Sequence, residues 1–228
     1  MAIQGIASYL STTDSMLQHW LHIQQHTGAP FVLLGGAGRD DLQALRDALA
    51  AAMAETVGAE NVVEGSRFDL AQRRAEVCEI VRQFNRQVRY LFQDTHYPRA
   101  LPGIPPPRAG LGVMVSASDS VANVWALIDA NDPPVTGFTP PLIVAGATRA
   151  QFVALIAALQ EAYSRFDQAE LAQQLARGVR DDVIVPLRRL LLLYRMAVLA
   201  TLSPDDPLIH SLPRVSPIRR KRKLEPTA

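Results

Sequence analysis

The sequence lacks several features that would identify its chemistry directly. It contains one cysteine, Cys78, which excludes an intramolecular disulfide and gives no indication of an oxidising compartment. Aromatic residues make up 6% of the 228 positions, and the alternating apolar runs typical of β-sheets are absent. Alanine and leucine dominate instead, and both favour helices. The composition predicts an all-α protein, long enough for one large domain or two small ones.

A long uninterrupted apolar run is also missing. Residues 1–16 contain no charged segment followed by a long apolar core, so they do not resemble a signal peptide. The most apolar stretch, 183–202, is interrupted by Arg188, Arg189 and Arg195, a charge density that disfavours a membrane span. We therefore expect a cytoplasmic protein that does not cross a membrane.

Lysine is nearly absent, and both lysines lie close to the C-terminus. Residues 214–228 hold six basic residues and one acidic residue, whereas the rest of the chain holds 17 basic and 21 acidic residues. The basic residues of this tail are Arg214, Arg219, Arg220, Lys221, Arg222 and Lys223. They are the candidate contacts for a polyanion, since cationic side chains bind phosphates without sequence specificity. Contact with the acidic body of a neighbouring subunit and a solvated chain end are the alternatives.

Two segments about 110 residues apart, 28–49 and 139–159, resemble each other. Pro30, Gly35 and Arg39 of the first fall on Pro141, Gly146 and Arg149 of the second. Similar matches occur upstream around the two tryptophans, Trp20 and Trp125, and downstream in the dipeptides Leu101-Pro102 and Leu212-Pro213. Three matches in the same order indicate a tandem duplication, which determines the architecture.

Each copy is predicted to form three helices followed by a proline-rich extended segment. The expected helices cover 6–26, 39–56 and 67–92 in the first copy, and 118–130, 149–177 and 179–202 in the second. Because three amphipathic helices bury one another only in part, two such units should pack into a six-helix bundle. The predicted division is a first repeat unit at 1–97, a proline-rich linker at 98–116, a second repeat unit at 117–213 and a basic flexible tail at 214–228.

A glycine-rich turn at 33–39 resembles the start of a phosphate site but contains neither G-x-G-x-x-G nor G-x-x-x-x-G-K-[ST]. Helix capping is the preferred interpretation, and anion binding the alternative. Gly38 would cap the first helix after the turn, and Thr148 with Gln151 has the spacing of a capping box in the second copy. An extended run precedes the turn in each copy, at 31–34 and 142–145, and the two runs are expected to pair as a small sheet.

Three histidines, His19, His22 and His26, are spaced so that they lie along one side of the first helix. Such a row is able to hold zinc, nickel or copper. It lies away from the apolar stripe and contains no H-E-x-x-H pattern, so surface histidines are the preferred interpretation. No metal or other cofactor is expected. Cys78 is interpreted as a small buried apolar residue.

The C-terminal stretch 194–198 and the following segment, D-P-L-I-H-S-L-P-R at 206–214, carry a resemblance to a known group. They resemble uncharacterised bacterial helical-bundle proteins whose last helix runs into an H-P-L-x-x-S-L-P-R-like segment. The P-F-x-V-x-G-A-T-type turn of that group is similar to residues 30–39 and 141–149, and Asp206 stands here in place of its histidine. The resemblance implies a helical bundle of bacterial origin and attaches no function to it.

We therefore expect a non-enzymatic structural or interaction protein, such as a self-assembling scaffold or adaptor. A duplicated chain presents related surfaces twice, which suits bridging or self-assembly, and no set of ionisable residues is copied between the halves. The expected partner is protein, first of all a second copy of the chain in a homo-oligomer. The alternative is a nucleic-acid-associated protein that binds phosphates non-specifically through the basic tail.

Overall fold

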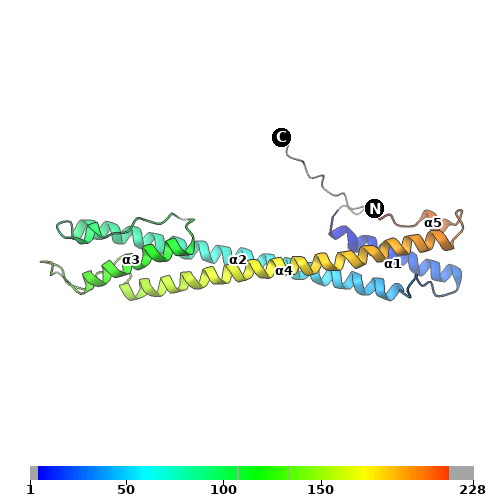
Figure 1. Cartoon of the computed structure of the whole chain (residues 1–228), viewed down its shortest axis with the longest axis horizontal. Helices are drawn as coiled ribbons and strands as arrows, with labels where there is room; N and C mark the ends of the chain where they lie inside the picture. Colours follow the sequence, from blue (N-terminus) through cyan, green and yellow to red (C-terminus); the bar gives the residue numbers. More distant parts are fainter. Residues whose placement is uncertain (1–4, 107, 133, 216–228) are drawn as a thin grey trace, which may run out of the picture. The chain divides into compact units, whose positions relative to one another are not determined.

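The computed structural model describes residues 5–106, 108–132 and 134–215, which are mostly helical and contain no β-strand (Figure 1). The helices are α1 (Ala7–Thr27), α2 (Arg39–Leu91), the 3-10 helix η1 (Tyr97–Arg99), α3 (Leu111–Asp129), α4 (Arg149–Thr201) and α5 (Pro207–His210). The predicted all-α class is confirmed.

The prediction of six separate helices is wrong, because α2 and α4 continue through the points where breaks were expected. Each of the two helices is 53 residues long. The expected breaks contain Gly58, Gly65 and Gly178, and a glycine inside a helix costs only about 1 kcal/mol relative to alanine. The surrounding alanine, glutamate, glutamine and arginine residues are strong helix formers that offset this cost.

The chain divides into two compact units that do not coincide with the predicted boundaries. Unit 1 combines the described residues up to Gly58 with those from Gln174 onward, and unit 2 is Ala59–Gln173. Each unit therefore contains one part of α2 and one part of α4. The predicted repeat units at 1–97 and 117–213 both contribute to each compact unit, and the predicted linker at 98–116 already includes the start of α3.

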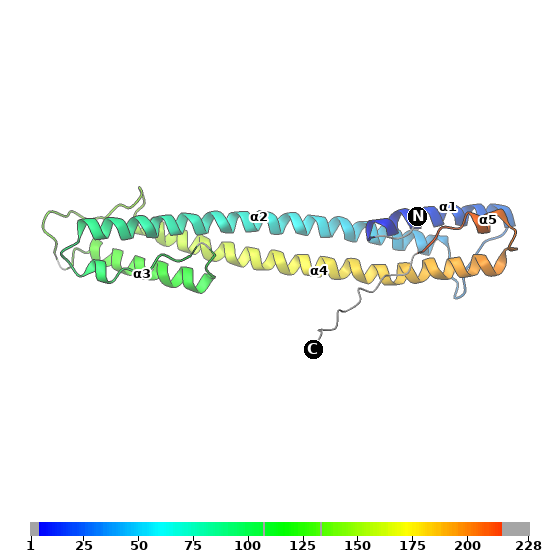
Figure 2. The ribbon, with the colours of Figure 1, turned by 90° about the horizontal axis from the view of Figure 1, so that it is seen from above.

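In unit 1, α1 lies beside the first part of α2 and the last part of α4 (Figures 1 and 2). Trp20 of α1 is fully buried and stacks on Tyr194 of α4, with 4.6 Å between the ring centroids. Its indole N–H donates a hydrogen bond of 3.0 Å to the carbonyl of Phe31. Other buried side chains of this core are Met16, Leu17, Ile23, Leu42, Leu49 and Leu191.

In unit 2, α3 occupies the corresponding place beside the last part of α2 and the first part of α4 (Figure 2). Trp125 of α3 stacks on Phe84 of α2 at 5.1 Å, and its indole N–H donates a hydrogen bond of 3.1 Å to the carbonyl of Leu142. A tryptophan, an aromatic partner and an accepting carbonyl thus occur together in both units, at positions 105 to 111 residues apart. Other buried side chains here are Val81, Val88, Phe92, Val121, Phe152 and Leu159.

The Leu-Pro dipeptides fold back onto the helices. Leu101 packs against the core of unit 2, and Leu212 is buried in the core of unit 1. In each case the prolyl carbonyl accepts a hydrogen bond from the nearby long helix. The donor is Asn85 in α2, at 3.0 Å, and Arg195 in α4, at 3.1 Å. Two residues 110 positions apart therefore anchor equivalent segments.

The expected small sheet between the two extended runs is wrong, since the runs lie in different units and each closes a turn of its own. The Leu33 amide donates to the carbonyl of Ala37 at 2.9 Å. Val144 and Ala147 exchange two hydrogen bonds of 3.0 and 2.8 Å. Backbone groups that were expected to pair across the chain are thus satisfied locally.

The predicted helix caps at the start of α2 and α4 are confirmed. Thr148 and Gln151 form the capping box, in which the Thr148 amide donates to Gln151 Oε1 at 2.8 Å and the Gln151 amide donates to Thr148 Oγ1 at 3.3 Å. At α2, the Gly38 amide donates to Asp41 Oδ2 at 2.7 Å. The carboxylate of Asp41 therefore satisfies one of the free amides at the start of α2.

Helix α3 is, within the described residues, the one helix that is long and apolar enough to cross a membrane by length and composition alone. It also packs into the core of unit 2 through Val121, Trp125 and Ile128. The core helix of a globular protein has the same composition, so the expectation that no segment crosses a membrane stays a prediction.

Candidate functional site

The structure describes one of the six cations in the predicted polyanion-binding tail. Arg214 is exposed and directly follows the anchored Leu212-Pro213 dipeptide. The remaining five, Arg219, Arg220, Lys221, Arg222 and Lys223, lie outside the described residues. Polyanion binding through the tail therefore stays a prediction from charge alone.

The prediction that the histidines of α1 lie on the surface is wrong for His19, which is buried. Its Nδ1 atom lies 2.6 Å from the hydroxyl of Tyr194, and its Nε2 atom lies 2.7 Å from the carbonyl of Leu208. A neutral ring protonated at Nε2 satisfies both contacts, because the carbonyl only accepts. His22 and His26 are exposed, and the described part of the chain contains no group of three metal-ligating side chains.

Cys78 is buried in the core of unit 2, as predicted. Its Sγ atom lies 3.7 Å from the carbonyl of Pro105, and burial raises the pKa of the thiol. A thiol with a raised pKa holds little of the reactive thiolate at neutral pH. These surroundings fit a packing residue and do not favour a nucleophile.

The last part of α4 is apolar on two opposite sides. One side, which includes Leu187, Leu191 and Tyr194, is buried in the core of unit 1. The other side is exposed to solvent, and we call it the outer α4 face. At about 100° per residue its side chains fall within one third of the helix circumference. Its apolar side chains are Leu175, Val185, Leu192, Met196 and Leu199. The exposed charged residues Asp181, Asp182 and Arg189 fall within the same third of the helix.

Exposure on the outer α4 face is high for apolar residues, reaching 70% at Val185 and 66% at Met196. Single exposed apolar residues need no explanation, whereas five on one third of a helix, with only three charged residues among them, favour a surface that another protein covers.

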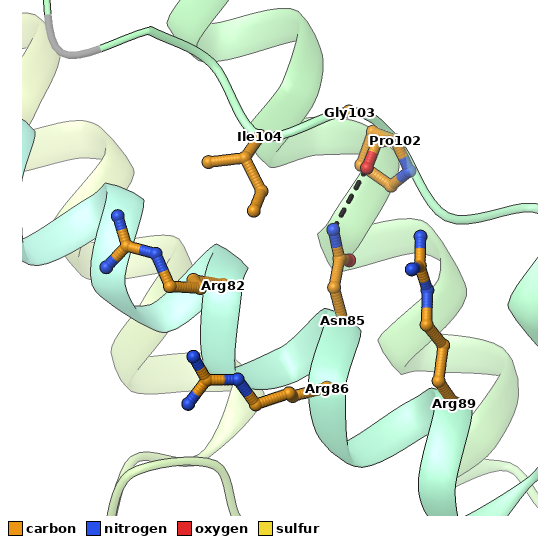
Figure 3. Close-up of a pocket in the computed structure, with 7 residues that line it drawn as sticks. All are labelled: Arg82, Asn85, Arg86, Arg89, Pro102, Gly103 and Ile104. Carbon is orange, nitrogen blue, oxygen red and sulfur yellow. Dashed lines mark hydrogen bonds between the residues drawn. The ribbon is translucent and has the colours of Figure 1, made fainter.

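A cavity of about 380 Å³ opens in unit 2 between α2 and the segment that follows η1 (Figure 3). Its α2 side is formed by Arg82, Asn85, Arg86 and Arg89, and its other side by residues 102–104. We call it the arginine cavity. Its volume lies at the lower end of the range usual for small-molecule sites.

The arginine cavity carries a positive charge that is only partly neutralised. Arg82 forms an ion pair with Glu79, one turn earlier on α2. A hydrogen bond from Gln83, followed by the charges of Arg82 and Arg86, lowers the pKa of Glu79. Arg86 and Arg89 are exposed and have no ion pair or hydrogen bond within the described residues. Within the described residues, Glu79 therefore pairs with one of the three guanidinium groups.

Asn85 fixes the wall of the arginine cavity and is itself 6% exposed. Its Nδ2 atom donates to the Pro102 carbonyl at 3.0 Å (Figure 3), while its Oδ1 atom is buried without a hydrogen-bond partner among the described residues. A buried amide oxygen without a donor costs free energy. The bond from Nδ2 holds residues 102–104 in place, while Oδ1 remains an unpaired acceptor beside the arginines.

The arginine cavity was not predicted, although part of its signal is present in the sequence. Arg82, Arg86 and Arg89 have the spacing that places side chains on one side of a helix. The second wall could not be foreseen, since it depends on the return of the proline-rich segment and on its bond to Asn85.

No family model, no curated protein and no solved structure matches the chain. The resemblance to bacterial helical-bundle proteins therefore stays a prediction.

Proposed function

We propose that this protein is a non-enzymatic scaffold or adaptor that assembles with copies of itself through the outer α4 face. The observation that carries the proposal is the pair of opposite apolar sides on the last part of α4, of which unit 1 buries only one. A second copy of the chain is the occupant, because the same apolar row on both copies makes a self-complementary contact.

The proposal includes the tandem duplication predicted from the sequence. It is supported by the recurrence of the tryptophan contacts at Trp20 and Trp125 and of the prolyl-carbonyl bonds at Asn85 and Arg195. Under this proposal each predicted copy supplies a first helix to one compact unit and the end of its long helix to the other. The expected location remains the cytoplasm.

The apolar side chains of the outer α4 face determine the strength of the contact. Full burial of a valine, leucine or methionine side chain contributes about 1.5–3 kcal/mol, so five half-exposed side chains contribute about 5 kcal/mol per copy. Two copies then gain about 10 kcal/mol, against an association cost of about 4–15 kcal/mol. The assembly should therefore be reversible and depend on protein concentration.

The test is the molar mass of the full chain by light scattering over a wide range of concentrations. We expect the mass to rise above the 24.9 kDa of one chain as concentration increases. In the variant Val185→Lys/Met196→Lys it should stay at one chain, since each lysine places a charge on the outer α4 face. A matched control, Val62→Lys/Val113→Lys, changes two comparably exposed valines in unit 2 and should assemble like the natural chain.

Two results would contradict the proposal: a single-chain mass at every concentration, or unchanged assembly of the Val185→Lys/Met196→Lys variant with a native helical spectrum. The absorbance ratio of the same samples tests the alternative. Nucleic acid that co-elutes at low salt and is lost at moderate salt would favour phosphate binding through the tail.

A further inference from the structure

We propose that the arginine cavity of unit 2 binds a small molecule containing a diphosphate group. The site is independent of the outer α4 face, which belongs to unit 1. It rests on four observations: the free guanidinium groups, the anchored wall, the cavity volume, and the residues found at the equivalent positions of α4.

The arginines supply the charge and the donors for such a ligand. Arg82 and Arg89 are seven residues apart, which is about 10 Å along a helix, with Arg86 between them. A guanidinium group offers several N–H donors in a planar fork that matches phosphate oxygens. Because Arg82 is already paired with Glu79, Arg86 and Arg89 are the principal ligands. Two charges spread along the helix fit two linked phosphates better than they fit a single phosphate.

The opposite wall lets a ligand approach closely. The Asn85 side chain holds the Pro102 carbonyl, and this bond keeps residues 102–104 facing α2 (Figure 3). A side chain built at Gly103 would meet no atom within 4 Å, so the backbone there borders open space. Ile104 is 47% exposed and lines the same cavity, where it offers an apolar contact to a less polar part of the ligand.

The equivalent positions in unit 1 indicate that the fold does not need these cations. Arg195 of α4 anchors the prolyl carbonyl as Asn85 does, 110 residues earlier in the chain. At the same offset, the positions of Arg82, Arg86 and Arg89 are taken by apolar residues, namely Leu192, Met196 and Leu199. The same backbone arrangement thus carries an apolar row in one unit and a cationic row in the other. The backbone arrangement of this segment therefore does not require arginine at these three positions.

The experiment is calorimetric titration of the full chain with inorganic pyrophosphate and, separately, with ADP, at fixed ionic strength. To remove binding by the tail, every protein in the series carries glutamine at positions 219–223. We expect saturable binding of pyrophosphate that weakens at least about tenfold in Arg86→Gln/Arg89→Gln, the loss of two charge-assisted hydrogen bonds. A matched control, Arg149→Gln/Arg165→Gln, removes two exposed arginines from α4 and should bind like its parent.

A further variant, Arg86→Lys/Arg89→Lys, keeps both charges and removes the planar fork. Its affinity for pyrophosphate should therefore lie between that of the parent and that of Arg86→Gln/Arg89→Gln. Tighter binding of ADP than of pyrophosphate would identify a nucleotide, with its less polar part against Ile104, and equal affinities would identify the diphosphate alone. The proposal is overturned if neither probe binds, or if Arg86→Gln/Arg89→Gln and the Arg149→Gln/Arg165→Gln control bind equally. Circular dichroism of each variant confirms that the helices are retained.

Discussion

Replacing either tryptophan by phenylalanine should destabilise the protein by a similar amount. In both units the indole is fully buried, stacks on an aromatic ring and donates to a backbone carbonyl, at 3.0 Å from Trp20 and 3.1 Å from Trp125. Phenylalanine keeps an aromatic ring but leaves the carbonyl without its donor, which costs about 1–3 kcal/mol. The smaller ring also leaves a void, so we expect a total loss of about 2–4 kcal/mol in the free energy of unfolding.

Urea unfolding followed by far-ultraviolet circular dichroism measures this loss. The chain has two tryptophans, one in each unit, so each variant also keeps a single fluorescent reporter. In Trp125→Phe the remaining Trp20 reports on unit 1, and in Trp20→Phe the remaining Trp125 reports on unit 2. A suitable control is Tyr90→Phe, which removes a hydroxyl from a side chain that is 80% exposed and should leave the unfolding midpoint unchanged.

The prediction is refuted if the free energy of unfolding falls by less than about 1 kcal/mol in one tryptophan variant and by the expected amount in the other. That result would show that the two indole bonds, although alike in geometry, do not have the same energetic role. It would also remove one of the supports for the proposed duplication.

Three smaller predictions follow from single contacts. Cys78 should react with a thiol reagent at least about tenfold more slowly in the native chain than in urea, since burial raises the pKa of its thiol; equal rates would contradict its placement in the core. Burial also raises the pKa of Tyr194 above its ordinary value of 10.0, so the stability it contributes is present below that pH and is lost as pH rises further. The free energy of unfolding should therefore fall less steeply above about pH 10 in Tyr194→Phe than in the natural chain, and equal slopes would refute this. Thr148→Ala should cost about 1 kcal/mol through loss of the capping box, with Thr148→Ser as the control that keeps it.

Local signals in the sequence predicted the helical content and several details of the fold. The caps at Gly38 and Thr148 depend on neighbouring residues, so spacing and residue type suffice to predict them. The helix breaks expected around Gly58, Gly65 and Gly178 do not occur, because glycine weakens a helix without ending it. Whether a helix continues is decided by packing along its whole length.

The features that the sequence did not predict all depend on contacts between distant segments. His19 is buried because α4 supplies the Tyr194 hydroxyl and α5 supplies the Leu208 carbonyl. Each compact unit likewise forms through contacts between distant segments, since it contains one part of α2 and one part of α4. The arginine cavity needs Asn85 to hold a segment 17 residues further along. A pattern within one helix contains no information on such partners.

The central claim is that a second copy covers the outer α4 face, and the most direct test is a spin label at Val185, near the middle of that face. With Val185→Cys labelled in a Cys78→Ala background, the assembled protein should show dipolar broadening, which only closely spaced spins produce. The broadening should disappear when labelled chains are mixed with an excess of unlabelled chains, and a label at the exposed Gln72 of unit 2 should give none. A spectrum without broadening from Val185→Cys, at concentrations where the molar mass exceeds one chain, would contradict the claim.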